Sequence, residues 1–192
     1  MISILGTFSL ASAAICSLFS IFGYFTSLIS KKRSTFYNKN ARLLNYVSII
    51  SIALAFVFLE IGLFRKDYSI KYVYEHTANS TSKLFTLTGA WAGLEGSLLL
   101  WALILGIFSL SMLFATRIKA NDKGTFNGTS TLANLIIVSI VFFFSLLIAV
   151  SSSPFATTST FYANGLGPNP LLQEHFAMAI HPPLLYTGYV GF

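Results

Sequence analysis

A single histidine, His181, stands directly before two prolines at the start of a new apolar segment. The residue before a proline is disfavoured in helical geometry, whereas proline is well tolerated at the first position of a helix. We therefore expect His181 to cap a membrane helix that Pro182 and Pro183 open, with its imidazole fixed at the membrane interface. A neutral imidazole in that place suits a metal ligand, in particular an axial ligand of haem iron. The alternative is a polar cap that hydrogen-bonds a carbonyl group.

The segment 88–101 is the second place where chemistry is expected. It contains Trp91 and Glu95 and leads directly into a long apolar stretch. Glu95 is interpreted either as a proton or cofactor contact at the membrane edge or as a simple cap of a helix N-terminus. Trp91 and Trp101 are not expected on one helix face, because ten residues turn a helix by about −80° net.

Other polar side chains have plainer interpretations. Glu60, near the end of another apolar stretch, is expected to form an exposed or snorkelling pair with Arg65. His76 and His175 lie between apolar stretches and are interpreted as surface histidines. The sequence has no HExxH, Walker, GxSxG or paired-carboxylate pattern, so it does not support hydrolysis or nucleotide binding by this chain alone.

The composition is typical of an integral membrane protein. Of the 192 residues, 55% are hydrophobic and 9% are charged, and the mean hydropathy is +0.73; soluble domains carry roughly 25% charged residues. The net charge of +6 comes from Lys and Arg between the apolar runs, where such residues set membrane topology. We therefore expect a lipid membrane and no nucleic acid as a partner. The uncharged first 30 residues are interpreted as a retained membrane helix rather than a removable signal.

The apolar runs predict an all-α fold, a polytopic membrane helical bundle with four full transmembrane helices and the start of a fifth. Each full run reaches the roughly 20 helical residues that cross a hydrocarbon core. The fifth is so short that either the chain is incomplete or another chain covers that end, because backbone groups are not left unpaired in lipid. The single membrane domain 1–192 then has expected spans at about 3–29, 43–64, 96–116, 132–150 and 183–192, the last one truncated.

The distribution of Lys and Arg predicts the orientation of these spans. Eight of them lie in the first and third connections between the full spans, four lie in the segment 65–83, and none lies in 151–181. Cationic loops face the cytosol or matrix, so the N-terminus, the segment 65–95 and the loop before His181 are expected on the opposite, outer side. The segment 151–180 is rich in Gly and Pro and should be ordered by packing rather than by regular structure.

Three blocks of the sequence resemble the CcmF/NrfE/CcsA haem-handling family, and specifically the N-terminal part of its CcmF members. Residues 91–101 are similar to the family's W-G-x-x-E-G-S-L-L-L-W, and residues 153–155 to its N-P-F. Residues 167–192 are similar to L-N-P-L-L-Q-D followed by H-P-P-L-L-Y-x-G-Y-V-G-F. Ala92 and Ser153 replace the commoner Gly and Asn, which are minor departures.

This resemblance implies a part of the membrane haem lyase that attaches haem to the CxxCH thiols of apocytochrome c. It implies that His181 is an outer-face haem ligand, with Trp91 and Glu95 as further candidates for cofactor contact and no catalytic residue in this chain. The haem would be shared with other chains, because the family's Trp-rich segment and its remaining histidine ligands come after the point where this chain stops.

The implied partners are a C-terminal CcmF piece with the Trp-rich segment, a CcmE-like haem chaperone, a CcmH-like thiol reductant and apocytochrome c. Richness in Phe, Ile, Lys and Asn suits an organellar gene, so we expect the mitochondrial inner membrane, with the His181 loop facing the intermembrane space. The alternative location is a bacterial inner membrane, with that loop facing the periplasm. The competing function is a structural or proton-pathway subunit of a respiratory complex, and the nearly charge-free spans count against it.

Overall fold

The computed structural model describes residues 1–30, 32–123, 128–169 and 175–191, and all of its regular elements are helices. No strand occurs within these ranges, where Ile70 and Thr157 form an isolated antiparallel bridge. The expected all-α fold is confirmed. The elements are α1 (Ile2–Ile29), α2 (Ser34–Arg65), α3 (Lys71–His76), α4 (Lys83–Thr88), a 3₁₀ turn (Gly89–Trp91), α5 (Leu94–Lys123), α6 (Gly128–Val150) and α7 (Ala177–Gly191).

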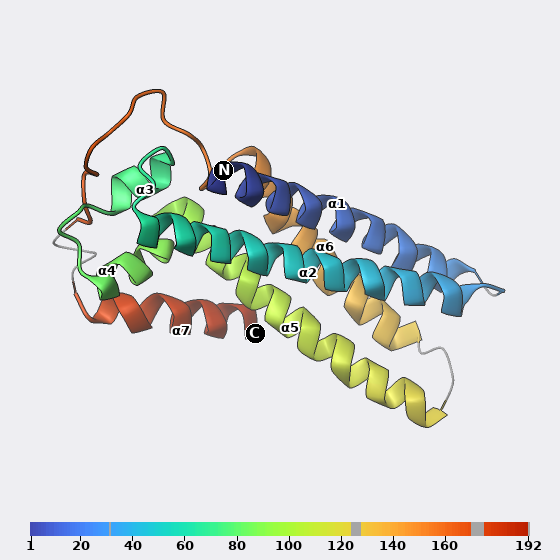
Figure 1. The fold of residues 1–192 in the computed structure, drawn as a ribbon. Helices are drawn as coiled ribbons and strands as arrows, with labels where there is room; N and C mark the ends of the chain where they lie inside the picture. The colour runs from blue at the N-terminus through green and yellow to red at the C-terminus, as the bar shows by residue number, and fades with distance from the viewer. Residues whose placement is uncertain (31, 124–127, 170–174, 192) are drawn as a thin grey trace.

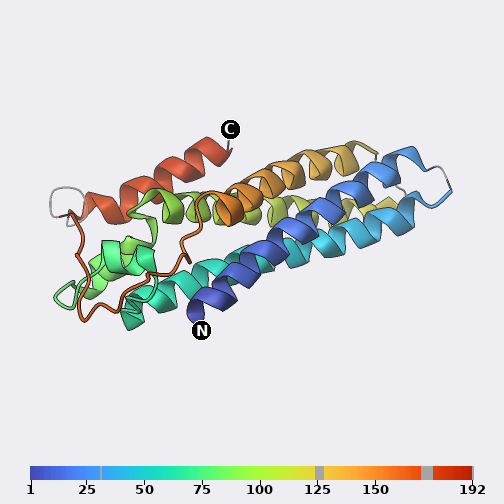
Figure 2. The ribbon, with the colours of Figure 1, turned by 90° about the horizontal axis from the view of Figure 1, so that it is seen from above.

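Four of the described helices, α1, α2, α5 and α6, are long and apolar enough to cross a membrane. They lie side by side and run in alternating directions (Figures 1 and 2). Helices α1 and α5 each pack against both α2 and α6, which closes the bundle. Helix α7 lies outside this bundle, alongside the first half of α5 (Figure 1). The chain is therefore a multi-pass membrane protein.

The interior of the bundle combines leucine and isoleucine side chains with many small and weakly polar ones. Ser48 Oγ donates a hydrogen bond to the Ala13 carbonyl at 3.0 Å, and Asn45 Nδ2 donates one to Ser109 Oγ at 3.2 Å. Small residues allow helix backbones to approach closely in lipid, and polar side chains bond across the interface. Many large apolar side chains are on the outside, where they suit a lipid environment; examples are Phe8, Phe19, Ile50 and Phe143.

One end of the bundle, here called the loop end, carries the N-terminus, α3, α4 and the segment 151–169 (Figure 1). This segment contains no helix, and it is bonded to α3 and to the residues just before it. Thr158 N–H donates to the Ser69 carbonyl at 2.9 Å, Leu166 N–H donates to the Tyr74 carbonyl at 2.8 Å, and the rings of Tyr74 and Tyr162 stack with centroids 3.9 Å apart. Packing therefore orders this part of the Gly- and Pro-rich segment, as the sequence predicts.

Phe155 anchors the start of the same segment to α1. Its side chain is 2% exposed, and a methyl group added at Gly6 would overlap with its ring. Ser3 Oγ also donates to the Phe155 carbonyl at 2.8 Å. The Ser-Pro-Phe block of the sequence is thus a packing element, and it needs a glycine on the facing helix.

Candidate functional site

His181 does not cap α7, so this sequence prediction is wrong. The helix begins at Ala177, and His181 is its fifth residue, with Pro182 and Pro183 inside the helix. The capping role belongs to His175, whose Nδ1 accepts the backbone N–H of Ala177 at 3.1 Å. The helix can start before the prolines because this cap satisfies a backbone N–H of its first turn.

The side chain of His181 lies on a face of α7 that the rest of the described structure does not cover. Leu184, Leu185 and Gly188 share this face at helical spacing and are exposed as well. His181 has no hydrogen-bond partner in the part of the chain that the structure describes. An imidazole on an apolar, uncovered surface fits one axial ligand of a haem, whose ring is apolar and whose iron takes nitrogen ligands.

His181 does not belong to a cluster of metal-ligating side chains within the described residues. No group of three or more His, Cys, Asp and Glu side chains that could hold a metal ion occurs in residues 1–30, 32–123, 128–169 and 175–191. A metal ion bound at His181 would therefore need ligands that no such group within these residues supplies.

Trp91, just before α5, is hydrogen-bonded to α7, the helix that carries His181. Its Nε1–H donates a hydrogen bond to the Met178 carbonyl at 2.9 Å. In an α-helix this carbonyl would accept the N–H of residue 182, but Pro182 has none. Ten residues further along, the ring of Trp101 lies nearly parallel to that of Tyr186, with centroids 6.1 Å apart. Two of the blocks that carry the family resemblance are therefore in direct contact.

The turn that carries Trp91 is held by Tyr72 of α3. The Tyr72 hydroxyl donates to the Gly89 carbonyl at 2.9 Å and accepts the Gly93 N–H at 3.0 Å. A methyl group added at Gly96 would overlap with this hydroxyl. Burial raises the pKa of Tyr72 above its ordinary value, so the hydroxyl keeps its proton.

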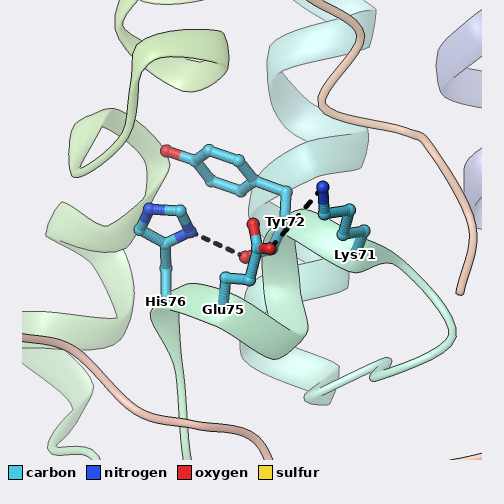
Figure 3. Close-up of polar contacts among 4 residues, drawn as sticks. All are labelled: Lys71, Tyr72, Glu75 and His76. Carbon is cyan, nitrogen blue, oxygen red and sulfur yellow. Dashed lines mark hydrogen bonds and ion pairs between the residues drawn. The ribbon is translucent and has the colours of Figure 1, made fainter.

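His76 is partly buried beside Tyr72, so its interpretation as a surface histidine is wrong. The two rings stack with centroids 4.2 Å apart (Figure 3). His76 Nδ1 lies 2.9 Å from the Tyr72 carbonyl, which can only accept, so Nδ1 carries the proton. A methyl group at Gly93 would lie 2.6 Å from His76 Nε2. The i, i+4 spacing of the two rings was the signal in the sequence that could have indicated this pair.

Glu95 lies in the first turn of α5, in agreement with its interpretation as a residue of a helix N-terminus. It lines a polar pocket of about 310 Å³ with Tyr72 and Glu75 of α3 and residues 150–153. Glu75 pairs with Lys71 at 3.7 Å on the rim of this pocket (Figure 3). Trp91 thus contacts α7, whereas Glu95 faces a pocket formed by α3 and the end of α6.

Glu60 does not form the expected pair with Arg65. Both of its carboxylate oxygens are buried and have no hydrogen-bond partner in the described ranges. The side chain lies near the end of α2, whose last residue is Arg65. A helix turns by about 100° per residue, so five residues place the two side chains on different faces.

The fold and the site together define a helical membrane domain that presents a single histidine on an uncovered helix face. No family model matches the chain. It is 36% identical over 149 residues to the cytochrome c-type biogenesis protein CycK of Rhizobium meliloti, a match that covers 76% of this chain and 21% of that protein. It is 31% identical over 194 residues to CcmF of Haemophilus influenzae, covering 100% of this chain and 28% of that protein.

A solved structure, that of the cytochrome c heme lyase CcmF, has the same fold over the whole chain. The TM-score is 0.76 at 28% identity, and the match covers 100% of this chain and 28% of that one. The chain is a homologue of the CcmF, NrfE and CycK cytochrome c-type biogenesis proteins. It spans about a quarter of the length of the curated relatives that it matches.

Proposed function

We propose that this chain is part of the membrane haem lyase of c-type cytochrome biogenesis, and that it helps to hold haem for attachment to apocytochrome c. The observation that supports this most directly is the position of His181, exposed on an apolar face of α7 beside Leu184 and Leu185. The homology to CcmF proteins supports the same role.

In this proposal haem is the group that is attached, and His181 supplies one of its axial ligands. The chain positions haem, while reduced cysteines and reductant come from other proteins. Trp91 and Glu95 have different roles. Trp91 supports the helix of His181 through its bond to Met178, and Glu95 lines the pocket beside α3 as a contact for a further group.

The proposed partners follow from the same site. A C-terminal CcmF piece with a Trp-rich segment would cover the uncovered face of α7 and supply the second haem ligand. A CcmE-like chaperone would deliver haem, and a CcmH-like protein would keep the thiols of apocytochrome c reduced. We place the chain in the mitochondrial inner membrane with the loop end facing the intermembrane space; a bacterial inner membrane with this end facing the periplasm is the alternative.

The buried carboxylate of Glu60 favours a second candidate, a proton-pathway subunit of a respiratory complex. Acids within membrane spans commonly mark proton relays. The two functions differ in their partners. Isolation of the chain from native membranes in mild detergent, followed by mass spectrometry, should recover a Trp-rich CcmF piece and a CcmE-like protein. Recovery of respiratory-complex subunits in stoichiometric amounts, without those proteins, would contradict the haem-lyase proposal.

The substitution His181→Ala tests the proposed ligand directly. We expect loss of covalent haem in c-type cytochromes, measured by haem staining, with an unchanged amount of the membrane-inserted chain. Addition of imidazole should restore part of the activity. The matched control is His175→Asn, which removes a second histidine near the same helix but keeps a side-chain acceptor for the first turn. Normal cytochrome maturation in His181→Ala would overturn the assignment of the ligand.

A further inference from the structure

The carbonyl of Met178 needs a donor from outside its own helix. Residue 182, whose N–H it would accept in a regular helix, is a proline, and the ring of Pro182 also crowds this carbonyl. A partly buried carbonyl without a hydrogen-bond partner costs free energy. The indole N–H of Trp91 provides the bond at 2.9 Å, from a residue that is 87 positions earlier in the chain.

We infer that Trp91 is a positioning residue for His181. The bond to Met178 fixes the helix one turn before the histidine and so sets where the imidazole stands relative to α5. This inference rests on the proposed function in one respect only, namely that His181 binds haem. The bond between the two chain segments does not depend on it.

The donor itself is held rigidly, as a positioning group requires. Trp91 ends the 3₁₀ turn whose first residue, Gly89, is bonded to the Tyr72 hydroxyl. The carbonyl of Trp91 accepts a hydrogen bond from Ser97 Oγ at 2.9 Å. These bonds hold the backbone from which the indole projects, so Trp91 links the position of α3 to that of α7.

A double-mutant cycle between Trp91 and Pro182 tests the inference without haem. The variants Trp91→Phe, Pro182→Ala and their combination are made in the full chain in lipid nanodiscs, and amide hydrogen exchange is measured over residues 177–186. Trp91→Phe should accelerate this exchange by roughly 3- to 10-fold, the worth of one hydrogen bond. In the Pro182→Ala background the helix supplies its own donor to Met178, so the same substitution should have an effect of less than about 2-fold.

Trp101→Phe is the matched control. It removes an indole of α5 that stacks on Tyr186 of α7 but, in the structure, does not bond the Met178 carbonyl. Its effect on exchange should be the same in both backgrounds. Equal effects of Trp91→Phe with Pro182 and with Ala at this position would overturn the inference, because the indole would then act by packing alone.

The haem readout separates this inference from the proposed function. In the complex assembled with its partner chains, haemin is titrated and its visible absorption reports the axial ligand. Trp91→Phe should weaken haemin binding by roughly 3- to 10-fold, and Pro182→Ala should remove this sensitivity. If the exchange cycle shows the coupling but His181→Ala leaves the haem spectrum unchanged, the proposed ligand is wrong, while the support of α7 by Trp91 stands.

Discussion

The hydroxyl of Tyr72 accepts the backbone N–H of Gly93 at 3.0 Å and, with its own proton, bonds the Gly89 carbonyl at 2.9 Å. One side chain from a six-residue helix thus satisfies two backbone groups of the turn that carries Trp91. The turn is thus held by a residue that lies outside the three sequence blocks that carry the family resemblance.

Tyr72→Phe should lower the stability of the chain by about 1–3 kcal/mol, because it leaves one buried and one partly buried backbone group without this partner. The measurement is the midpoint of thermal or denaturant unfolding in detergent. Tyr74→Phe is the control, since it keeps the ring that stacks on Tyr162 and should change the midpoint very little. An equal loss in both variants would mean that the Tyr72 hydroxyl is not what stabilises the turn.

The pH dependence of stability should reflect the same hydroxyl. Burial raises the pKa of Tyr72 in the folded chain, whereas a tyrosine in the unfolded chain ionises near pH 10. As the pH rises, the tyrosine therefore loses its proton first in the unfolded state. The stabilisation of the folded chain by the protonated Tyr72 hydroxyl is fully present below about pH 10 and is lost as the pH rises further. Unfolding midpoints between pH 8 and 11.5 should fall less steeply in Tyr72→Phe than in the wild type, and an unchanged slope would contradict this assignment.

Gly6→Ala should destabilise the chain, because the added methyl group would overlap with the ring of Phe155. We expect a loss of about 1–3 kcal/mol, the usual cost of overpacking. Gly188→Ala is the control: nothing lies within 4 Å of a methyl group at that position, and alanine is the better helix former. The unfolding midpoints of the two variants should therefore move in opposite directions, and a stable Gly6→Ala variant would show that α1 can shift away from Phe155.

Glu60→Gln should not lower the stability of the chain and should raise it by about 1 kcal/mol, because it removes a buried carboxylate that has no hydrogen-bond partner in the described structure. The unfolding midpoint measures this effect, and Glu75→Gln, which breaks an exposed pair with Lys71, should change it by less than about 1 kcal/mol. A clear loss of stability in Glu60→Gln would mean that the carboxylate has a partner in the assembled protein. A loss of respiratory proton transfer without loss of c-type cytochromes would favour the proton-pathway function instead.

The sequence by itself determined the membrane class, the all-α fold, the long apolar helices and the resemblance to CcmF proteins. These are properties of local composition and of motifs that are contiguous in the chain, so they can be read without knowing which segments meet. The absence of regular structure in the segment 151–169 is also a local property, because its Gly and Pro residues disfavour helices and strands.

Only the tertiary structure decided where α7 begins, what Trp91 does and how Tyr72 and His76 are placed. Local rules put His181 at a cap, because proline disfavours a helical residue before it. In the structure His181 is helical nevertheless. Two bonds hold the start of this helix: one from Trp91 to Met178, 87 positions apart, and one from the Ala177 N–H to His175. Pairing between segments this distant depends on how the helices pack in three dimensions, and no pattern within either segment specifies it.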